Sequence, residues 1–76
     1  MAIAPQQELR DQFAKNLHTA RVSRGLSQQD LARLCDLNRT EISLFERSER
    51  SPRLEMIVLL SRALEVSPED LLHDID

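Results

Sequence analysis

The strongest constraint on the fold comes from residues 27–47, where two short stretches of helical periodicity are separated only by residues 36–37. Ser27 is placed to cap the first stretch, and Asp30 follows three residues later, where the acidic partner of a capping box sits. So short a connection makes two helices cross at a steep angle, and their contact needs a small side chain, which Ala32 supplies. These residues predict two short helices joined by a tight turn.

The second stretch extends from Asn38 to Arg47, with Asn38 as its N-cap and with Ile42 and Phe45 as its apolar face. Every position that such a pair of helices must bury is apolar, although any of them could have been polar. These positions are Leu31, Ala32, Cys35, Leu37, Ile42 and Phe45. The spacing therefore predicts a helix-turn-helix at about 27–47.

The rest of the chain also has helical periodicity, because it contains one glycine, three prolines and no segment that alternates like a strand. A first helix is expected to begin with Pro5 as its first residue and to end at Arg24-Gly25, where glycine favours the stop. A fourth helix is expected over 54–64, and Ser67 caps a fifth. The fold class predicted is all-α, a compact five-helix bundle.

The size and composition favour one globular domain over residues 1–76, with the fourth and fifth helices at about 54–75. The hydrophobic fraction of 41% and charged fraction of 30% argue against a disordered chain. No apolar run approaches the roughly 20 residues that a bilayer demands, so no membrane partner is expected. Residues 1–7 carry no recognisable signal, and the expected compartment is the cytoplasm.

The chain offers little for metal or covalent chemistry. Cys35 is the only cysteine, so an internal disulfide is impossible, and we expect it to be a buried small hydrophobe. The two histidines, His18 and His73, lie at opposite ends of the sequence and match no catalytic or metal-binding spacing. No cofactor, metal or small-molecule ligand is expected, and the chain itself is not expected to be an enzyme.

The net charge of −3 argues against nucleic acid as a partner, because binding to phosphates favours a basic protein. The distribution of charge along the sequence weakens this argument against nucleic-acid binding. From residue 65 onward there are five acidic and no basic residues, whereas residues 1–64 contain ten basic and eight acidic residues, for a net +2. Most of the acidity therefore lies at one end of the chain.

The motif also matches a known pattern over about residues 13–72. The matching segments are Leu26-Ser-Gln-Gln-Asp-Leu-Ala, Leu37-Asn-Arg-Thr-Glu-Ile-Ser, Phe45-Glu-Arg, Pro52, Leu54 and Leu64-Glu-Val-Ser-Pro-Glu-Asp-Leu. They resemble the Cro and phage-repressor (XRE-type) family, which implies a lambda-repressor-like fold and binding of double-stranded DNA. Within that family the chain is most similar to the controller proteins of restriction–modification systems, although phage Cro-like regulators and antitoxins share the pattern. It departs from the family at Asp36 and Ser48, where glycine is usual, and at Glu49, where a basic residue is common.

The exposed face of the third helix is the expected base reader. Opposite Ile42 and Phe45 it displays Arg39, Thr40, Ser43 and Leu44. The planar guanidinium of Arg39 can donate two hydrogen bonds to guanine O6 and N7, and Leu44 can contact a thymine methyl. Thr40 suits a base edge or a phosphate. The alternative for Arg39 and Thr40 is an ordinary solvated first turn, and for Ser43 the two interpretations are about equally good.

Five residues are expected to contact the DNA backbone: Gln28, Asn38, Arg47, Arg50 and Arg53. Gln28 stands at the start of the second helix, where unpaired N–H groups favour a phosphate, and the resemblance implies that use. Each arginine can bind a phosphate, and Arg50 can alternatively reach toward the minor groove. Taken singly, each is equally well explained as a surface arginine.

The resemblance also implies a structural ion pair between Arg21 and Glu46, which joins the first helix to the third. Such a pair would hold the reading helix in place without itself reading sequence.

One module contacts few bases, so a two-fold dimer that reads half-sites about 34 Å apart is expected. The core stripe of the fourth helix is expected to be Leu54, Ile57, Leu60 and Leu64, which leaves other apolar residues for a homodimer interface. The candidates are Met56, Leu59, Leu71, Leu72 and Ile75. The alternative is a slightly larger core.

These expectations together predict a sequence-specific transcription regulator that binds a near-palindromic operator as a dimer. The competing hypothesis is a protein–protein interaction module of the same fold that does not bind DNA, and the net acidity and Glu49 motivate it.

Overall fold

The structure, a computed structural model, describes residues 6–75 and contains within that range five α-helices and no strand. The all-α, five-helix architecture predicted from the sequence is confirmed. Pro5, predicted to be the first helical residue, lies outside the described residues. The helices are α1 (Gln6–Ser23), α2 (Gln28–Leu34), α3 (Arg39–Glu46), α4 (Leu54–Leu64) and α5 (Pro68–Leu71).

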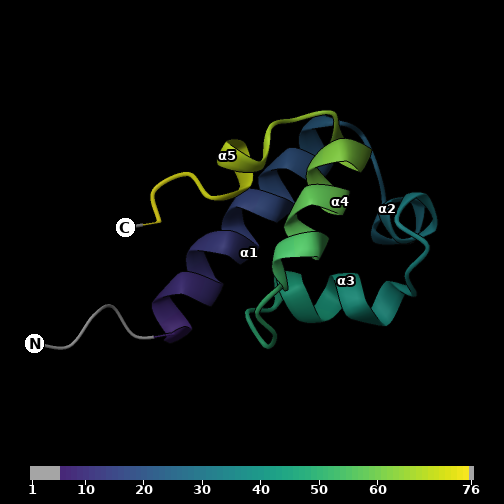
Figure 1. The fold of residues 1–76 in the computed structure, drawn as a ribbon. Coiled ribbons are helices and arrows are strands. Elements are labelled where there is room, and N and C mark those ends of the chain that lie inside the picture. The colour runs from purple at the N-terminus through teal and green to yellow at the C-terminus, as the bar shows by residue number, and fades with distance from the viewer. Residues whose placement is uncertain (1–5, 76) are drawn as a thin grey trace, which may run out of the picture.

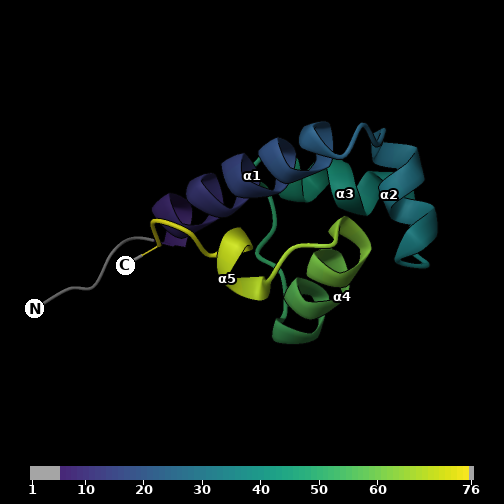
Figure 2. The same cartoon turned by 90° about the horizontal axis from the view of Figure 1, so that it is seen from above.

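The long α1 is the support on which the other helices are arranged (Figure 1). Helix α3 packs against both α1 and α2, α4 packs against α2 and α5, and α5 returns to α1. The view from above shows α2 and α3 at one end of α1 and α5 toward the other (Figure 2). As a result α3 lies at the edge of the molecule, along the bottom of Figure 1.

The core joins α1 to the two short helices. The rings of Phe13 on α1 and Phe45 on α3 meet edge to face, with centroids 6.2 Å apart and an interplanar angle of 86°, an arrangement that aromatic rings favour. Ala32 on α2 has no exposed surface, as expected for a small residue at a close helix contact. The other buried residues of this core are Leu17, Leu31, Cys35, Ile42, Leu60, Leu64 and Leu71.

Three helices begin at the caps that the sequence predicts. Ser27 and Ser67 each form a complete capping box, with Asp30 and Asp70 as the acidic partners. The side chain of Asn38 accepts a hydrogen bond of 3.0 Å from the backbone N–H of Glu41. Because each cap satisfies a backbone donor that the helix leaves unpaired, the starting points of these helices are defined by local contacts.

Four helices are followed, one or two residues after their last residue, by a residue in the left-handed conformation: Gly25, Asp36, Ser48 and Glu65. After each of them the chain turns back and a backbone N–H bonds to the carbonyl five residues earlier, as from Leu37 to Ala32 at 2.8 Å. The left-handed conformation costs a non-glycine residue about 1–2 kcal/mol. The tight turn predicted at residues 36–37 therefore forms without glycine, and so does the turn at Ser48, where the family usually has glycine.

The predicted core stripe of α4 is wrong at its first residue. Leu54 is 72% exposed, because it occupies the first turn of α4 and has no helix packed over it. Ser61 is buried instead, and its hydroxyl donates to the carbonyl of Val58 at 2.8 Å, which removes the cost of burying it. Within residues 6–75, no helix is long and apolar enough to cross a bilayer.

We expect Ala32→Leu to destabilise the fold by about 1–3 kcal/mol, because the extra atoms must enter a site with no exposed surface. Chemical denaturation monitored by circular dichroism measures the change. Gln29→Leu, at an exposed position of the same helix, is the matched control and should leave the midpoint nearly unchanged. Equal midpoints for the two variants would contradict the close crossing of α2 and α3.

Candidate nucleic-acid interface

Helix α3 presents its N-terminal end to solvent. Ile42 and Phe45 are buried on one side, so the opposite side faces away from the core. Arg39 and Thr40 are exposed, as predicted for base-reading residues, whereas Ser43 and Leu44 are half-buried. All four predicted residues therefore keep some accessible surface, and the first turn of α3 has the most.

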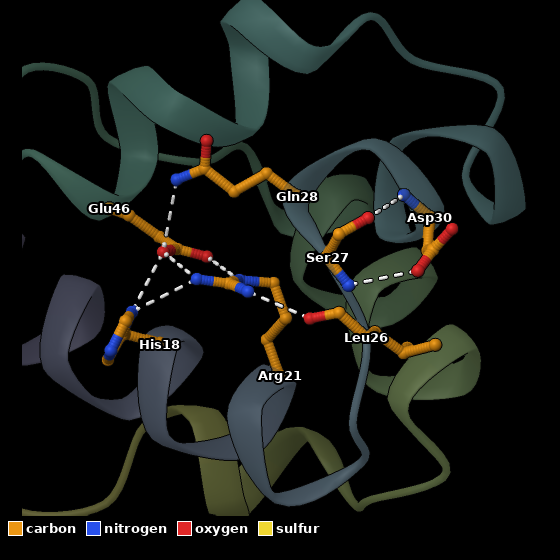
Figure 3. A network of polar contacts seen from close by, with 7 residues as sticks. All are labelled: His18, Arg21, Leu26, Ser27, Gln28, Asp30 and Glu46. Carbon is orange, nitrogen blue, oxygen red and sulfur yellow. Dashed lines mark hydrogen bonds and ion pairs between the residues drawn. The ribbon is translucent and has the colours of Figure 1, made fainter.

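The C-terminal end of α3 is held by the ion pair predicted between Arg21 and Glu46, which is present (Figure 3). The contact is bidentate: Arg21 Nε lies 2.6 Å from Glu46 Oε2, and Nη2 lies 2.9 Å from Oε1. The third guanidinium nitrogen, Nη1, donates to the carbonyl of Leu26 at 2.8 Å. Two parallel hydrogen bonds fix orientation as well as distance, so α1 sets the position of α3.

Two further side chains converge on the same carboxylate. His18 Nδ1 lies 3.0 Å from Glu46 Oε1, and Gln28 Nε2 donates to that oxygen at 3.3 Å. His18 was missed in the sequence, although it stands three residues before Arg21 on the same face of α1. Gln28, predicted to bind a phosphate, is half-buried, and its amide carbonyl makes no hydrogen bond within the described chain. The network thus joins α1, α2 and α3 at one point.

The carboxylate of Glu46 is ionised in this setting. Burial raises its pKa, but hydrogen bonds from Arg21, His18 and Gln28 outweigh burial and lower the pKa below its ordinary value. The hydrogen bond with Glu46 in turn raises the pKa of Arg21. Side-chain exposures of 12% for Arg21 and 5% for Glu46 show that the charges are shielded from water, so each depends on the other.

The three arginines predicted to bind the backbone are all exposed, near the C-terminal end of α3. Arg47 caps the end of α3 and pairs with Glu49, with 2.9 Å between Nε and Oε2. Arg50 and Arg53 border an open groove of about 510 Å³ against α3. The groove is also lined by Glu41, Phe45, Ser51, Glu55 and Met56. Asn38 is exposed, and its side-chain oxygen is used to cap α3.

The predicted dimer interface requires one correction. Leu71 has no exposed surface, because α5 packs it into the core, so it cannot contact a second chain. Leu59 and Leu72 are 43% and 41% exposed and remain available. Met56 and Ile75 are half-buried against the core and offer only part of their surface.

The structure offers no evident metal-binding cluster in the part it describes, residues 6–75. Cys35 is buried, as predicted, and burial raises the pKa of its thiol, which keeps it protonated at neutral pH.

Comparison with known proteins gives a consistent set of relatives. A family model described as helix-turn-helix matches residues 17–71, which include all of α2 to α5. Control protein C.BamHI of Bacillus amyloliquefaciens is 44% identical over 61 residues, covering 79% of this chain and 75% of its own. The solved structure of the hypothetical transcription factor NHTF from Neisseria has a TM-score of 0.82 at 38% identity, covering 95% of this chain and 83% of that one. That of the restriction-modification controller protein C.AhdI from Aeromonas hydrophila has a TM-score of 0.79 at 35% identity, covering 82% and 94%.

Proposed function

The chain belongs to the XRE-type helix-turn-helix family of transcription regulators, and from that premise we propose that it binds a near-palindromic operator as a dimer. Helix α3 enters the major groove. The observation that carries the proposal is the exposed first turn of α3, with Arg39 and Thr40, on a helix whose other end is fixed by the buried Arg21–Glu46 pair. A recognition helix held this rigidly loses little conformational entropy when it binds DNA.

Base recognition is assigned to the accessible face of α3. Arg39 suits guanine, because its guanidinium can donate to O6 and N7 together. Thr40 lies beside it and suits a base edge or a phosphate. Ser43 and Leu44 have less accessible surface, and Leu44 suits a thymine methyl.

Backbone contacts are assigned to both flanks of this face. Gln28 stands at the first residue of α2 and keeps its carbonyl and one amide hydrogen for other partners, so an N–H can point at a phosphate. Asn38 caps the start of α3, and Arg47, Arg50 and Arg53 follow its end. These positions bracket α3 from both ends, as phosphate contacts that set register should.

Dimerisation is proposed through the exposed Leu59 and Leu72, with contributions from the partly exposed Met56 and Ile75. Two copies related by a two-fold axis would read half-sites about 34 Å apart. The relatives C.BamHI and C.AhdI carry the name of control or controller proteins, and we extend that role to this chain. Its occupancy of an operator in the cytoplasm would then rise with its own concentration, because dimerisation and DNA binding are coupled.

The second candidate, a protein-interaction module without DNA binding, is favoured by one contact. Glu49 pairs with Arg47 and so offsets one of the charges assigned to phosphate. The two candidate functions predict different effects of salt concentration on binding to duplex DNA.

We expect binding to random duplex DNA to weaken steeply as salt rises. If Arg47, Arg50 and Arg53 each neutralise one phosphate, the logarithm of the affinity should fall with the logarithm of salt concentration at a slope of about −2.7 per protomer. Fluorescence anisotropy with a labelled duplex at several salt concentrations measures it. A flat and weak response would favour the interaction module, and selection of duplexes from a random pool would then return no consensus.

A further inference from the structure

The first two turns of α1 contact the loop that follows α3. The amide nitrogen of Gln7 donates to the backbone carbonyl of Ser48 at 3.2 Å and to Asp11 Oδ1 at 2.9 Å. The amide oxygen of Gln7 accepts from Arg10 Nη2 at 3.3 Å. Both ends of the Gln7 side chain are therefore engaged, and the group formed by Gln7, Arg10 and Asp11 is called the α1 clasp below.

The clasp contacts the turn that follows the C-terminal end of α3. Ser48 is in the left-handed conformation with φ of 63°, and the N–H of Glu49 bonds back to the carbonyl of Leu44 at 2.9 Å. The carbonyl of Ser48, within this turn, accepts the hydrogen bond from Gln7. Hydrogen bonds from Gln7 and Ser48 lower the pKa of Asp11, so Asp11 is an ionised acceptor for the Gln7 amide at neutral pH.

The clasp also borders the far end of the same loop. Arg10 lines an apolar groove of about 220 Å³ together with Ser51 and Pro52 of the loop and Leu9 of α1. Residues 47–53, called the α3–α4 loop below, are thus held near their first residues by Gln7, and near their last they line the same groove as Arg10. This loop carries the three exposed arginines assigned to the backbone.

We propose that Gln7 is a positioning residue for the phosphate contacts, because it holds the Ser48 carbonyl and so orders the loop that carries Arg47 and Arg50 before DNA arrives. This inference rests on the proposed DNA binding. An ordered loop loses less conformational freedom on binding than a mobile one, so the affinity gained comes without a contact between Gln7 and DNA.

The role is separable from the stability of the fold. Gln7 is exposed, and α3 is held independently by the Phe13–Phe45 contact and the Arg21–Glu46 pair. Removal of the exposed hydrogen bonds of the Gln7 side chain should leave these intact. Base reading by the first turn of α3 should also be unchanged, since Arg39 and Thr40 lie at the opposite end of that helix from Ser48.

The test compares Gln7→Met with Gln6→Met, because Gln6 is an exposed glutamine whose side chain makes no hydrogen bond within the described chain. We expect Gln7→Met to bind random duplex DNA about three- to tenfold more weakly than the wild type. Its salt slope should be shallower by about 0.9 for each phosphate that the loop arginines no longer neutralise. Gln6→Met should match the wild type, and all three proteins should melt alike and select the same bases.

Two results would overturn the inference while leaving the proposed function standing. In the first, both variants bind salt-dependently with the wild-type affinity and slope. In the second, Gln7→Met loses affinity at an unchanged slope together with a lower melting temperature, which would make Gln7 a purely structural residue. Absence of salt-dependent binding by the wild type would instead overturn the proposed function, and this inference with it.

Discussion

Glu46→Ala is expected to destabilise the fold by about 3–5 kcal/mol, because it leaves the guanidinium of Arg21 shielded from water without its counter-charge. The side chains of Arg21 and Glu46 are 12% and 5% exposed. Without the carboxylate, the guanidinium keeps its bond to the carbonyl of Leu26 and its contact of 3.2 Å with His18 Nδ1, but it has no acidic partner. The variant also loses the acceptor shared by His18 and Gln28. The free energy of unfolding from urea titration measures the loss.

The matched control is Glu49→Ala, which removes a carboxylate from an exposed arginine pair on the same segment of chain. Exposed pairs contribute about 0–1 kcal/mol, so this variant should unfold almost like the wild type. A double replacement, Arg21→Met with Glu46→Leu, removes both charges and should recover much of the loss. If Glu46→Ala and Glu49→Ala lowered stability equally, the network in Figure 3 would not fix α3 in the way described.

The same carboxylate makes stability depend on pH in a defined direction. Because the pKa of Glu46 is lowered in the folded chain, its contribution is fully present above its ordinary pKa of 4.5 and is lost as pH falls through the folded value. The wild type should therefore lose the stabilising contribution of the Glu46 carboxylate in acid. The Glu46→Ala variant has no such contribution at any pH. The difference in unfolding free energy between the two proteins should shrink as the pH is lowered below about 4.5.

Features set by neighbours in sequence could be predicted from the chain alone. Each capping box joins residues three apart, so the starts of α2 and α5 follow from Ser27 and Ser67. The turn at residue 36 follows from the shortness of the connection between two helical stretches. The exposure of Arg39 and Thr40 follows from the burial of Ile42 and Phe45 on the other side of α3.

Contacts between distant residues could not be predicted in this way. A hydrogen bond from Gln7 to the carbonyl of Ser48 spans 41 positions and involves a backbone group, which leaves no trace in residue type. The burial of Leu71 and the exposure of Leu54 depend on which turns of α4 and α5 pack against another helix. Periodicity indicates which face of a helix is apolar, but it does not indicate how much of the length of that face is buried. The Arg21–Glu46 pair was predicted only through the family resemblance, whereas His18 required the folded geometry.

Removal of the Arg39 guanidinium is expected to have the largest effect on recognition. Arg39→Ala should cost about 1–3 kcal/mol for each half-site, through the two hydrogen bonds that its guanidinium can give to one guanine. A symmetric dimer has this interaction twice, so a full operator obtained by selection should bind weaker by roughly 2–6 kcal/mol. Preference should relax at one base position in each half-site, while affinity for random duplex changes much less.

Arg62→Ala is the charge-matched control for this experiment. Arg62 is exposed in the last turn of α4, which ends on the side of the molecule opposite α3 in Figure 1. It should leave both operator and random binding near the wild-type values. Equal weakening of operator and random DNA by Arg39→Ala would make Arg39 a phosphate contact and would move base reading to Thr40, Ser43 and Leu44. The difference between the two DNAs therefore decides whether the exposed end of α3 reads sequence or only binds charge, because phosphate contacts act alike on every duplex.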